Sequence, residues 1–279
     1  MVVSIVGLGL IGGSIAKDLM KGQLFSRVIG VDNNPAHAKK ALENKLVNEI
    51  NDLEEAIKIS DLIILAVPVD AAEKLLIKIL DSKSNPVVMD VGSTKSKILD
   101  AVMDHPKRSN FVATHPMSGT EYSGPDAAIN NLFKDKLAII CDAEGSSEEA
   151  LAIVKSVYQQ LGSIIKIMNP LEHDASAAYV SHISHISSFA LALTVLETEK
   201  NKDNIRLMAS GGFRTTVRLA NSNDKTWAPI FLENKENVIE VLTGFIDHMN
   251  RFKEAIENDN RNELNAMMRN ANRVKDIIN

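Results

Sequence analysis

Short apolar runs alternate with amphipathic helical patterns over the first 168 residues of the chain. The runs are bounded by Pro, Gly, Asp or Ser, which is typical of strands buried between helices. This alternation predicts an α/β fold in which helices cover both faces of a doubly wound, mostly parallel sheet. The predicted strands are 2–6, 28–31, 61–68, 86–91, 111–114, 137–141 and 164–167.

The strand pattern stops near Pro170, and three long helical patterns dominate the rest of the chain. They cover 172–200, 235–258 and 261–278. Small residues crowd the first of these helices, which permits the close approach of a second helix. We therefore expect an α/β domain over 1–169, an all-α domain over 170–279, and a tight helical homodimer.

The segment Gly-Leu-Gly-Leu-Ile-Gly follows the first predicted strand directly and opens a helix. Its first glycine allows a tight turn, its second lets the backbone approach a pyrophosphate, and its third lets the helix pack closely on the strand. The helix N-terminus then meets the phosphate charge. This context favours a Rossmann-type dinucleotide site over a merely structural glycine-rich turn. The residues predicted to contact the cofactor here are Gly7, Gly9, Leu10, Ile11 and Gly12.

Asp32 lies twenty positions after Gly12, at the end of the second predicted strand. Its carboxylate would accept hydrogen bonds from the ribose hydroxyls and repel a 2′-phosphate, so the sequence favours NAD over NADP. The nearby Lys39 and Lys40 keep NADP open. Ligands bind beyond the carboxyl ends of parallel strands, so we also expect Val67, Pro68 and Ser93 to line the cofactor.

Composition narrows the class of protein. The chain has 279 residues, 45% of them hydrophobic, and a net charge of −5, so no global basic field attracts nucleic acid or a membrane. The single cysteine, Cys141, falls in a predicted strand, where we expect it to be buried. No secretory leader and no long uninterrupted apolar run is evident, so we expect a cytoplasmic protein. The chain ends inside a helical pattern, from which we expect a monofunctional protein.

Two polar segments follow predicted strands at the edge of the sheet where ligands bind. One contains Ser93 and the other begins at His115. A histidine titrates near neutrality and can take a proton from an alcohol while the carbon gives up hydride, which is the base that a dehydrogenase needs. Ser93 would hydrogen-bond that imidazole or the hydroxyl. The alternatives are that His115 only caps a turn and that Lys95 and Lys97 only begin a solvated helix.

Further candidates lie in the helical half of the chain. Arg214 and Arg218 are four residues apart, so on a helix they would present two guanidinium groups to a dicarboxylate. The alternative is surface ion pairs with Glu233 or Asp224. His182 and His185 are one turn apart, but no third ligand at metal spacing is evident, so we predict no metal site. We expect His185 to face the pocket and His182 to be structural.

Taken together, these segments resemble the prephenate dehydrogenase family, including its arogenate-using relatives, over nearly the whole chain. The matching segments are GLGLIGGS at 7–14, DVGSTK at 90–95, HPMSGTE at 115–121, SHISH at 181–185, GGFR at 211–214 with Arg218, and WAPIFLEN at 227–234. Ser118 stands where many members of the family carry alanine.

The resemblance implies a role for each matching residue. His115 would be the catalytic base, Ser93 would orient it or the substrate hydroxyl, and Arg218 would bind a substrate carboxylate. The other residues implied to surround the substrate are Gly211 and Arg214 in the substrate segment, His185 near the substrate side chain, Thr120 and Glu121 at the entrance, and Trp227 beside the pocket.

The implied reaction is the NAD-dependent oxidative decarboxylation of prephenate to 4-hydroxyphenylpyruvate, with tyrosine as a possible feedback inhibitor and a homodimer as the assembly. Three alternatives stay open. The first is an arogenate dehydrogenase. The second is a β-hydroxyacid dehydrogenase, for which the charged stretch around Lys200 and Lys202 is a poor place for a catalytic lysine. The third is a noncatalytic NAD-binding sensor, which would need neither a base nor a carboxylate clamp.

Overall fold

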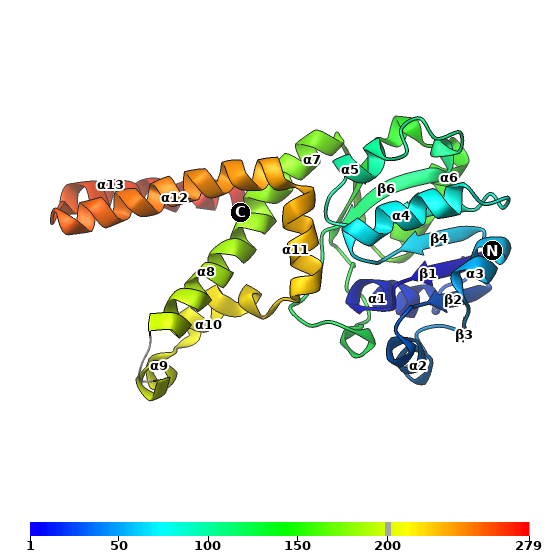
Figure 1. Ribbon diagram of the computed structural model, residues 1–279, viewed down its shortest axis with the longest axis horizontal. Coiled ribbons are helices and arrows are strands. Elements are labelled where there is room, and N and C mark those ends of the chain that lie inside the picture. Colours follow the sequence, from blue (N-terminus) through cyan, green and yellow to red (C-terminus); the bar gives the residue numbers. More distant parts are fainter. Residues whose placement is uncertain (199–201, 279) are drawn as a thin grey trace. The chain divides into compact units, whose positions relative to one another are not determined.

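The computed structural model describes residues 1–198 and 202–278, and the chain forms two compact units, Met1–Asn234 and Lys235–Asn279. The first unit contains an eight-stranded sheet in the order β3-β2-β1-β4-β5-β6-β7-β8, with helices packed around it (Figure 1). Only the β6–β7 pair is antiparallel among the seven pairings of this sheet. The predicted doubly wound, mostly parallel fold is confirmed.

Most strands begin and end close to the predicted positions. The largest difference is at the end of β4, which ends at Leu65 rather than at residue 68. β6 continues through His115 to Pro116, so the candidate base lies within a strand rather than in a loop. The two-residue strand β3 was not predicted, because it is too short to show a period. The strands are β1 (Val2–Val6), β2 (Arg27–Val31), β3 (Glu49–Ile50), β4 (Leu62–Leu65), β5 (Val87–Asp90), β6 (Phe111–Pro116), β7 (Leu137–Cys141) and β8 (Ile164–Met168).

Helices connect these strands, and several begin at a side chain that caps the helix. Asn34 accepts a hydrogen bond from the backbone N–H of Ala36 at 3.0 Å, and Asp52 accepts one from that of Glu55 at 2.8 Å. Such caps satisfy N–H groups that the first helical turn leaves without a partner. The helices are α1 (Leu10–Leu19), α2 (Pro35–Glu43), α3 (Leu53–Ile59), α4 (Val69–Leu80), α5 (Ser96–Asp100) and α6 (Glu148–Gln160).

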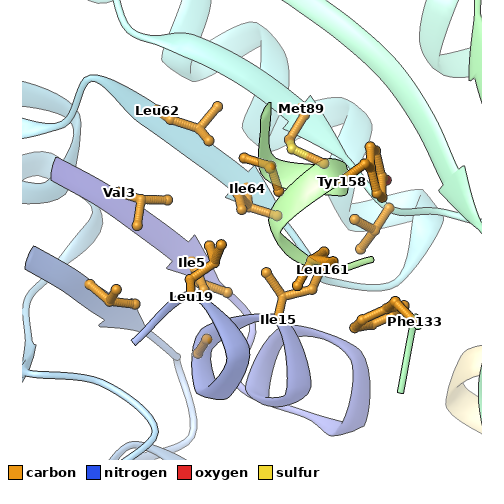
Figure 2. Close-up of a cluster of buried hydrophobic side chains, with 14 of the residues drawn as sticks. Val3, Ile5, Ile15, Leu19, Leu62, Ile64, Met89, Phe133, Tyr158 and Leu161 are labelled. Atoms are coloured by element: carbon orange, nitrogen blue, oxygen red, sulfur yellow. The ribbon is translucent and has the colours of Figure 1, made fainter. Parts of the chain in front are cut away.

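Two apolar clusters cover the two faces of the sheet. Leu62 and Ile64 of β4 belong to one cluster, and Ile63 and Leu65 belong to the other, because successive strand residues point to opposite faces. Figure 2 shows the first cluster, in which side chains of β1, β4 and α1 meet. Cys141 lies in the second cluster, so its predicted burial is confirmed, and burial raises the pKa of its thiol to about 12.

The remainder of the first unit is helical. The predicted helix 172–200 is present, but one turn of π-helix (Ala178–His182) separates α7 (Pro170–Ala177) from α8 (Ile183–Thr198). Lys200, the predicted end of this helix, lies outside the described residues. Three shorter helices and a 3-10 turn follow, which the sequence patterns did not resolve. They are α9 (Lys202–Met208), α10 (Gly211–Val217), the 3-10 turn Arg218–Asn221, and α11 (Asp224–Glu233), which packs against α4.

The second unit is helical and contains no strand within its described residues, 235–278. Its long helix α12 (Lys235–Glu257) contacts α13 (Arg261–Ala271), and an ion pair joins Arg251 Nη2 to Glu263 Oε1 at 2.7 Å. A 3-10 turn, Asn272–Val274, separates α13 from α14 (Lys275–Ile278), so the predicted helix 261–278 is interrupted near its end.

The boundary predicted at Pro170 lies inside the first unit, between β8 and α7, so the division into domains 1–169 and 170–279 stays a prediction.

Among the described helices, one segment, Pro170–Glu197, is long and apolar enough to cross a membrane by length and composition. One such helix is weak evidence for a membrane protein.

Candidate active site

A buried chain of three polar side chains begins at His115. Its Nδ1 atom lies 2.8 Å from Nε2 of His173, and the two rings meet edge to face with centroids 5.0 Å apart. His173 Nδ1 in turn lies 2.8 Å from Oδ1 of Asp174. β6 supplies the first histidine and the first turns of α7 supply the other two residues, so the site joins the sheet to the helical segment.

Asp174 is held by the backbone that follows β5. Its Oδ1 accepts a hydrogen bond from the N–H of Lys95, and its Oδ2 accepts one from the N–H of Ser96, both at 2.8 Å. The carboxylate therefore caps the start of α5 from another element of the fold. With the bond from His173 it accepts three donors, which favours its ionised form.

His173 and Asp174 were not among the predicted site residues. The bond between His115 and His173 joins positions 58 residues apart, and no spacing rule links a strand end to a helix across that separation. The available signal was a His-Asp pair four residues after Asn169, which caps α7. A His-Asp pair also occurs on solvent-exposed helix surfaces, so the pair by itself did not identify a site.

Lys95 is fully buried, so its interpretation as part of a solvated helix start is wrong. Its Nζ forms an ion pair with Asp90 and donates a hydrogen bond to the carbonyl of Thr114 at 2.7 Å. Asp90 also accepts from the N–H of Thr114 at 3.0 Å, and from the N–H of Gly92 at 2.9 Å. The buried pair thus ties the end of β5 to the residue before His115.

Lys97, the other lysine of this segment, is exposed. Its Nζ lies 3.5 Å from Oε2 of Glu233 and donates to the carbonyl of Leu232 at 3.3 Å. The solvated interpretation holds for this residue.

The pKa values of this cluster favour a neutral base beside an ionised carboxylate. Burial lowers the pKa of His115 well below its ordinary value, and the neighbouring His173, Lys95 and His182 lower it further, while Asp174 acts in the opposite direction. Burial by itself would raise the pKa of Asp174, but hydrogen bonds from His173, Ser96 and Lys95 bring it below its ordinary value. A neutral imidazole is the form that can accept a proton.

Ser93 lies half-buried in the loop between β5 and α5. Across the described ranges it makes no hydrogen bond to the imidazole of His115, whose Nδ1 is instead paired with His173. The other roles expected for Ser93, contact with a substrate hydroxyl and contact with the cofactor, stay predictions.

A second group of side chains lies on α8 and α11. The ring of His185 stacks on Trp227, with centroids 3.3 Å apart and planes inclined by 24°, and its Nδ1 bonds to the carbonyl of Ser181 at 3.0 Å. Burial lowers the pKa of His185, and the positive charge of Arg218 lowers it further. The structure therefore brings His185, Trp227 and Arg218 into one neighbourhood.

His182 is fully buried one turn earlier. Its Nδ1 lies 3.3 Å from Nδ2 of Asn234, and burial lowers the pKa of its imidazole to about 4. Its Nε2 atom has no hydrogen-bond partner among the described residues. The ring is neutral and packs edge-on against Trp227 and Phe231, as the expected structural role requires.

Arg218 begins the 3-10 turn after α10, and its Nη1 lies 2.8 Å from Oε2 of Glu121. It therefore pairs with neither Glu233 nor Asp224, the partners weighed for it in the sequence. Arg214 is exposed on α10. The backbone leaves the helical conformation at Val217, so Arg214 and Arg218 do not share one continuous α-helical face.

The other predicted substrate residues lie in the loop after β6 and on α10 and α11. Thr120 and Glu121 follow β6 in a loop, where the Oγ1 of Thr120 accepts from the N–H of Tyr122 at 3.3 Å. Gly211 is exposed at the first residue of α10. Trp227 lies in the first turn of α11, next to His185.

The glycines between β1 and α1 have the properties that a dinucleotide site needs. Gly7 has a φ of +94°, a backbone angle that residues with a side chain rarely adopt. A Cβ on Gly12 would lie 1.9 Å from the carbonyl oxygen of Gly7. A Cβ on Gly9 would meet nothing within 4 Å, so this glycine borders open space at the N-terminus of α1. The open cradle and the free helix N–H groups fit a pyrophosphate.

Asp32 lies beside this turn, at the end of β2. Its Oδ2 accepts from the N–H of Leu8 and its Oδ1 from that of Asn34, both at 2.9 Å, which fixes the carboxylate. The two lysines that kept NADP open lie near acidic residues: Lys39 is 3.8 Å and Lys40 is 3.7 Å from Glu43. The remaining predicted contacts lie nearby, with Leu10 and Ile11 at the start of α1 and Val67 and Pro68 before α4.

No group of three or more His, Cys, Asp or Glu residues is placed to hold a metal ion within residues 1–198 and 202–278. The described side chains place a buried imidazole at His115, a guanidinium group at Arg218 beside a carboxylate, and a glycine turn that fits a dinucleotide.

Two protein-family models match the chain. The model described as the nucleotide-binding domain of prephenate dehydrogenase matches residues 15–167, and the model described as its dimerization domain matches residues 169–270.

Individual proteins agree with this match. The prephenate dehydrogenase of Bacillus subtilis is 29% identical over 278 residues, which cover 98% of this chain and 75% of that protein. The cyclohexadienyl dehydrogenase of Zymomonas mobilis is 29% identical, covering 91% of this chain and 88% of that protein. A crystal structure of A. aeolicus prephenate dehydrogenase with hydroxyphenyl propionate and NAD+ is 30% identical, covers 100% of this chain and 98% of that one, and has a TM-score of 0.89. Synechocystis arogenate dehydrogenase is also 30% identical, covers 100% of both chains, and has a TM-score of 0.76.

Proposed function

The chain belongs to the prephenate dehydrogenase family, and we propose that it catalyses the NAD-dependent oxidative decarboxylation of prephenate to 4-hydroxyphenylpyruvate, a step of tyrosine biosynthesis. The observation that carries the proposal is the neutral, buried His115 at the carboxyl end of β6, on the edge of the sheet where ligands of such folds bind. A dehydrogenase needs such a base beside the reacting hydroxyl group.

In this reaction His115 takes the proton of the ring hydroxyl while the ring carbon loses hydride. NAD, when bound, accepts that hydride. The electron pair of the bond to the ring carboxylate then enters the ring as carbon dioxide leaves, and the ring becomes aromatic. The oxygen ends as a phenol, so His115 returns the proton that it took. Because aromatisation is strongly downhill, the protein contributes mainly position and proton transfer.

The turn between β1 and α1 would hold the cofactor. The open space at Gly9 admits the pyrophosphate, and Asp32 accepts bonds from the ribose hydroxyls. Lys39 and Lys40 lie near Glu43, whose carboxylate is already an anionic partner for both lysines. This placement supports NAD over NADP, because the lysines are not reserved for a 2′-phosphate. Val67 and Pro68 complete the lining from the end of β4.

The substrate would lie between His115 and Arg218. Prephenate is a dicarboxylate, and the guanidinium group of Arg218 would bind one carboxylate after leaving Glu121. His185, stacked on Trp227, would lie near the side chain of the substrate, and Ser93 would contact its hydroxyl. Thr120, Gly211 and Arg214 would border the site.

The test is formation of NADH or NADPH by the purified protein with prephenate or arogenate, each with NAD or NADP. We expect turnover to be highest with prephenate and NAD. Preference for arogenate would keep the mechanism and change the substrate. If none of the four pairs gave NADH or NADPH while NAD still bound, the enzyme proposal would be wrong and the NAD-binding sensor would replace it.

Arogenate dehydrogenase is the second candidate. The Synechocystis arogenate dehydrogenase covers the whole of this chain at 30% identity, so the same fold accommodates that activity in a relative. The two substrates differ only in a side-chain keto or amino group, so discrimination would lie in the contacts near His185.

The assembly and its regulation are also proposals. A homodimer joined through the helical domains is supported by the match to a dimerization domain and by exposed apolar residues on α7 and α8 such as Leu171, Leu193 and Leu196. A mass by light scattering of twice the 30.5 kDa chain would agree, and a monomer would contradict it. Tyrosine resembles the substrate and would inhibit at the active site, and the enzyme would act in the cytoplasm.

A further inference from the structure

The line of side chains from Asp174 through His173 to His115 has a direction that the donors and acceptors determine. An ionised carboxylate only accepts hydrogen bonds, and Asp174 already accepts from the N–H groups of Lys95 and Ser96. The 2.8 Å contact between Asp174 Oδ1 and His173 Nδ1 therefore requires a proton on that nitrogen.

The proton on Nδ1 of His173 determines which atoms donate and which accept in the rest of the line. In a neutral imidazole the second nitrogen is an acceptor, so Nε2 of His173 accepts. Its 2.8 Å contact with His115 Nδ1 then requires the proton on His115 Nδ1. The Nε2 atom of His115 is left with a free lone pair, which is the atom that a general base uses.

We propose that His173 and Asp174 are positioning residues that hold His115 as the Nδ1–H tautomer, with Nε2 free to accept the substrate proton, and that they share the positive charge which forms there. The kinetic part of this inference rests on the proposed function, but the tautomer does not.

The proton balance of the step is complete within the site. The hydroxyl proton moves to Nε2 of His115, which becomes an imidazolium cation. The Nδ1 proton stays on His115 or shifts to Nε2 of His173, and in either case the cation faces the carboxylate of Asp174 through hydrogen bonds. When the ring becomes aromatic, the proton returns from Nε2 to the phenolic oxygen. No exchange with solvent is needed.

The surroundings of His115 disfavour a positive charge on its ring, so proton uptake there needs a compensating negative charge. Burial opposes a positive charge on His115 most, and a second charge on His173 opposes it next. Lys95, from the segment after β5, and His182, from the π-helical turn, oppose it as well. Asp174 is the group that favours this charge. Without it, proton uptake at this buried position would be more costly.

The first experiment reads the tautomer directly and needs no turnover. Nitrogen-15 labelling of the histidines gives ring-nitrogen shifts that distinguish protonated from unprotonated nitrogens, and His115→Asn identifies the signals of His115 by their loss. We expect a protonated Nδ1 and an unprotonated Nε2 on His115 near neutral pH. The opposite tautomer would overturn the proposal.

The second experiment compares two replacements of His173. In His173→Gln the amide can still accept from His115 through its oxygen and donate to Asp174 through its nitrogen, whereas His173→Leu can do neither. We expect His173→Leu to lower kcat by about 10²- to 10³-fold, and His173→Gln to stay within about tenfold of the native protein. The proposal places neither ligand on His173, so the KM for prephenate and the Kd for NAD should change little in both variants. The Tm of His173→Leu should fall, because Asp174 loses a buried hydrogen-bond donor that His173→Gln can replace.

The outcomes separate positioning from packing. Native-like kcat in His173→Leu, or an equal loss in both variants, would overturn the proposal, because the first shows that the line is unnecessary and the second that its donor and acceptor are irrelevant. His248→Gln, at an exposed position of α12, is the matched control and should be native-like. If the native protein itself gave no NADH, the proposed function would fail while the tautomer measurement would still decide the inference.

Discussion

At the scale of a residue, the chemistry depends on the imidazole of His115. Replacing His115 with Asn keeps a polar side chain of similar size but removes a group that can accept a proton. We expect kcat to fall by about 10²- to 10⁴-fold with little change in the Kd for NAD, because the residue acts on proton transfer. Steady-state kinetics and a fluorescence titration with NAD measure the two quantities. Near-normal turnover in this variant would show that His115 is not the base.

The burial of His115 also predicts a pH dependence. Its pKa is lowered, so the neutral, active form is present at neutral pH and is lost only as the pH falls through that lowered pKa. We expect the acid limb of kcat/KM to lie below the ordinary range of histidine. A rate profile with prephenate and saturating NAD gives this limb. A limb within the ordinary range would mean that the imidazole is more solvated than its buried position indicates.

At the scale of an element, the turn from β1 to α1 separates two roles of glycine. In Gly12→Ala the new Cβ would lie 1.9 Å from the carbonyl of Gly7, which is backbone and cannot move aside cheaply. In Gly9→Ala the new Cβ meets no protein atom within 4 Å, but it enters the space offered to the pyrophosphate. We expect Gly12→Ala to lower the Tm, and Gly9→Ala to leave the Tm unchanged and weaken NAD binding at least about tenfold.

Thermal unfolding without NAD and a titration with NAD test both variants side by side. An unchanged Tm in Gly12→Ala would mean that the turn can open without loss. Unchanged NAD affinity in Gly9→Ala would place the pyrophosphate elsewhere.

The elements that the sequence predicted are those with a long or strong pattern. Buried strands such as β4 are continuous apolar runs, so the Rossmann-type sheet could be predicted. The spacing of the glycines indicates a tight turn with close backbone contacts, so the nucleotide turn could be predicted as well. β3 has two residues and α10 has seven, too few to show a period. The pairing of His115 with His173 could not be predicted, because it depends on α7 reaching β6 across 58 positions of sequence.

The interpretation of Lys95 was wrong for a related reason. A lysine near a helix start is usually solvated, and only the fold shows that the Asp90 carboxylate and the Thr114 carbonyl lie within its reach. The same holds for Arg218, whose partner Glu121 is 97 residues away in the sequence. Local patterns predict elements, whereas the buried polar contacts of the candidate site depend on how distant elements pack.

At the scale of the whole molecule, the buried histidines couple folding to pH. Burial lowers the pKa of His182 to about 4 and that of His115 well below its ordinary value. In the unfolded chain both would bind protons near the ordinary histidine value of 6.5, so the unfolded state binds more protons and the free energy of unfolding falls as the pH drops. The stability from His182 is fully present above pH 6.5 and is lost progressively down to about pH 4.

We expect the free energy of unfolding to fall between pH 7 and pH 5 by on the order of 2 kcal/mol for His182, and His115 to add a further fall in the same direction. Urea unfolding of the protein without ligands at several pH values measures this slope. In His182→Gln, which can still accept from Asn234, the slope should be smaller by the share of one histidine, whereas His248→Gln, at an exposed position, should keep the native slope. Equal slopes in the native protein and His182→Gln would mean that His182 is protonated in the folded state, which its full burial between Trp227 and Phe231 opposes.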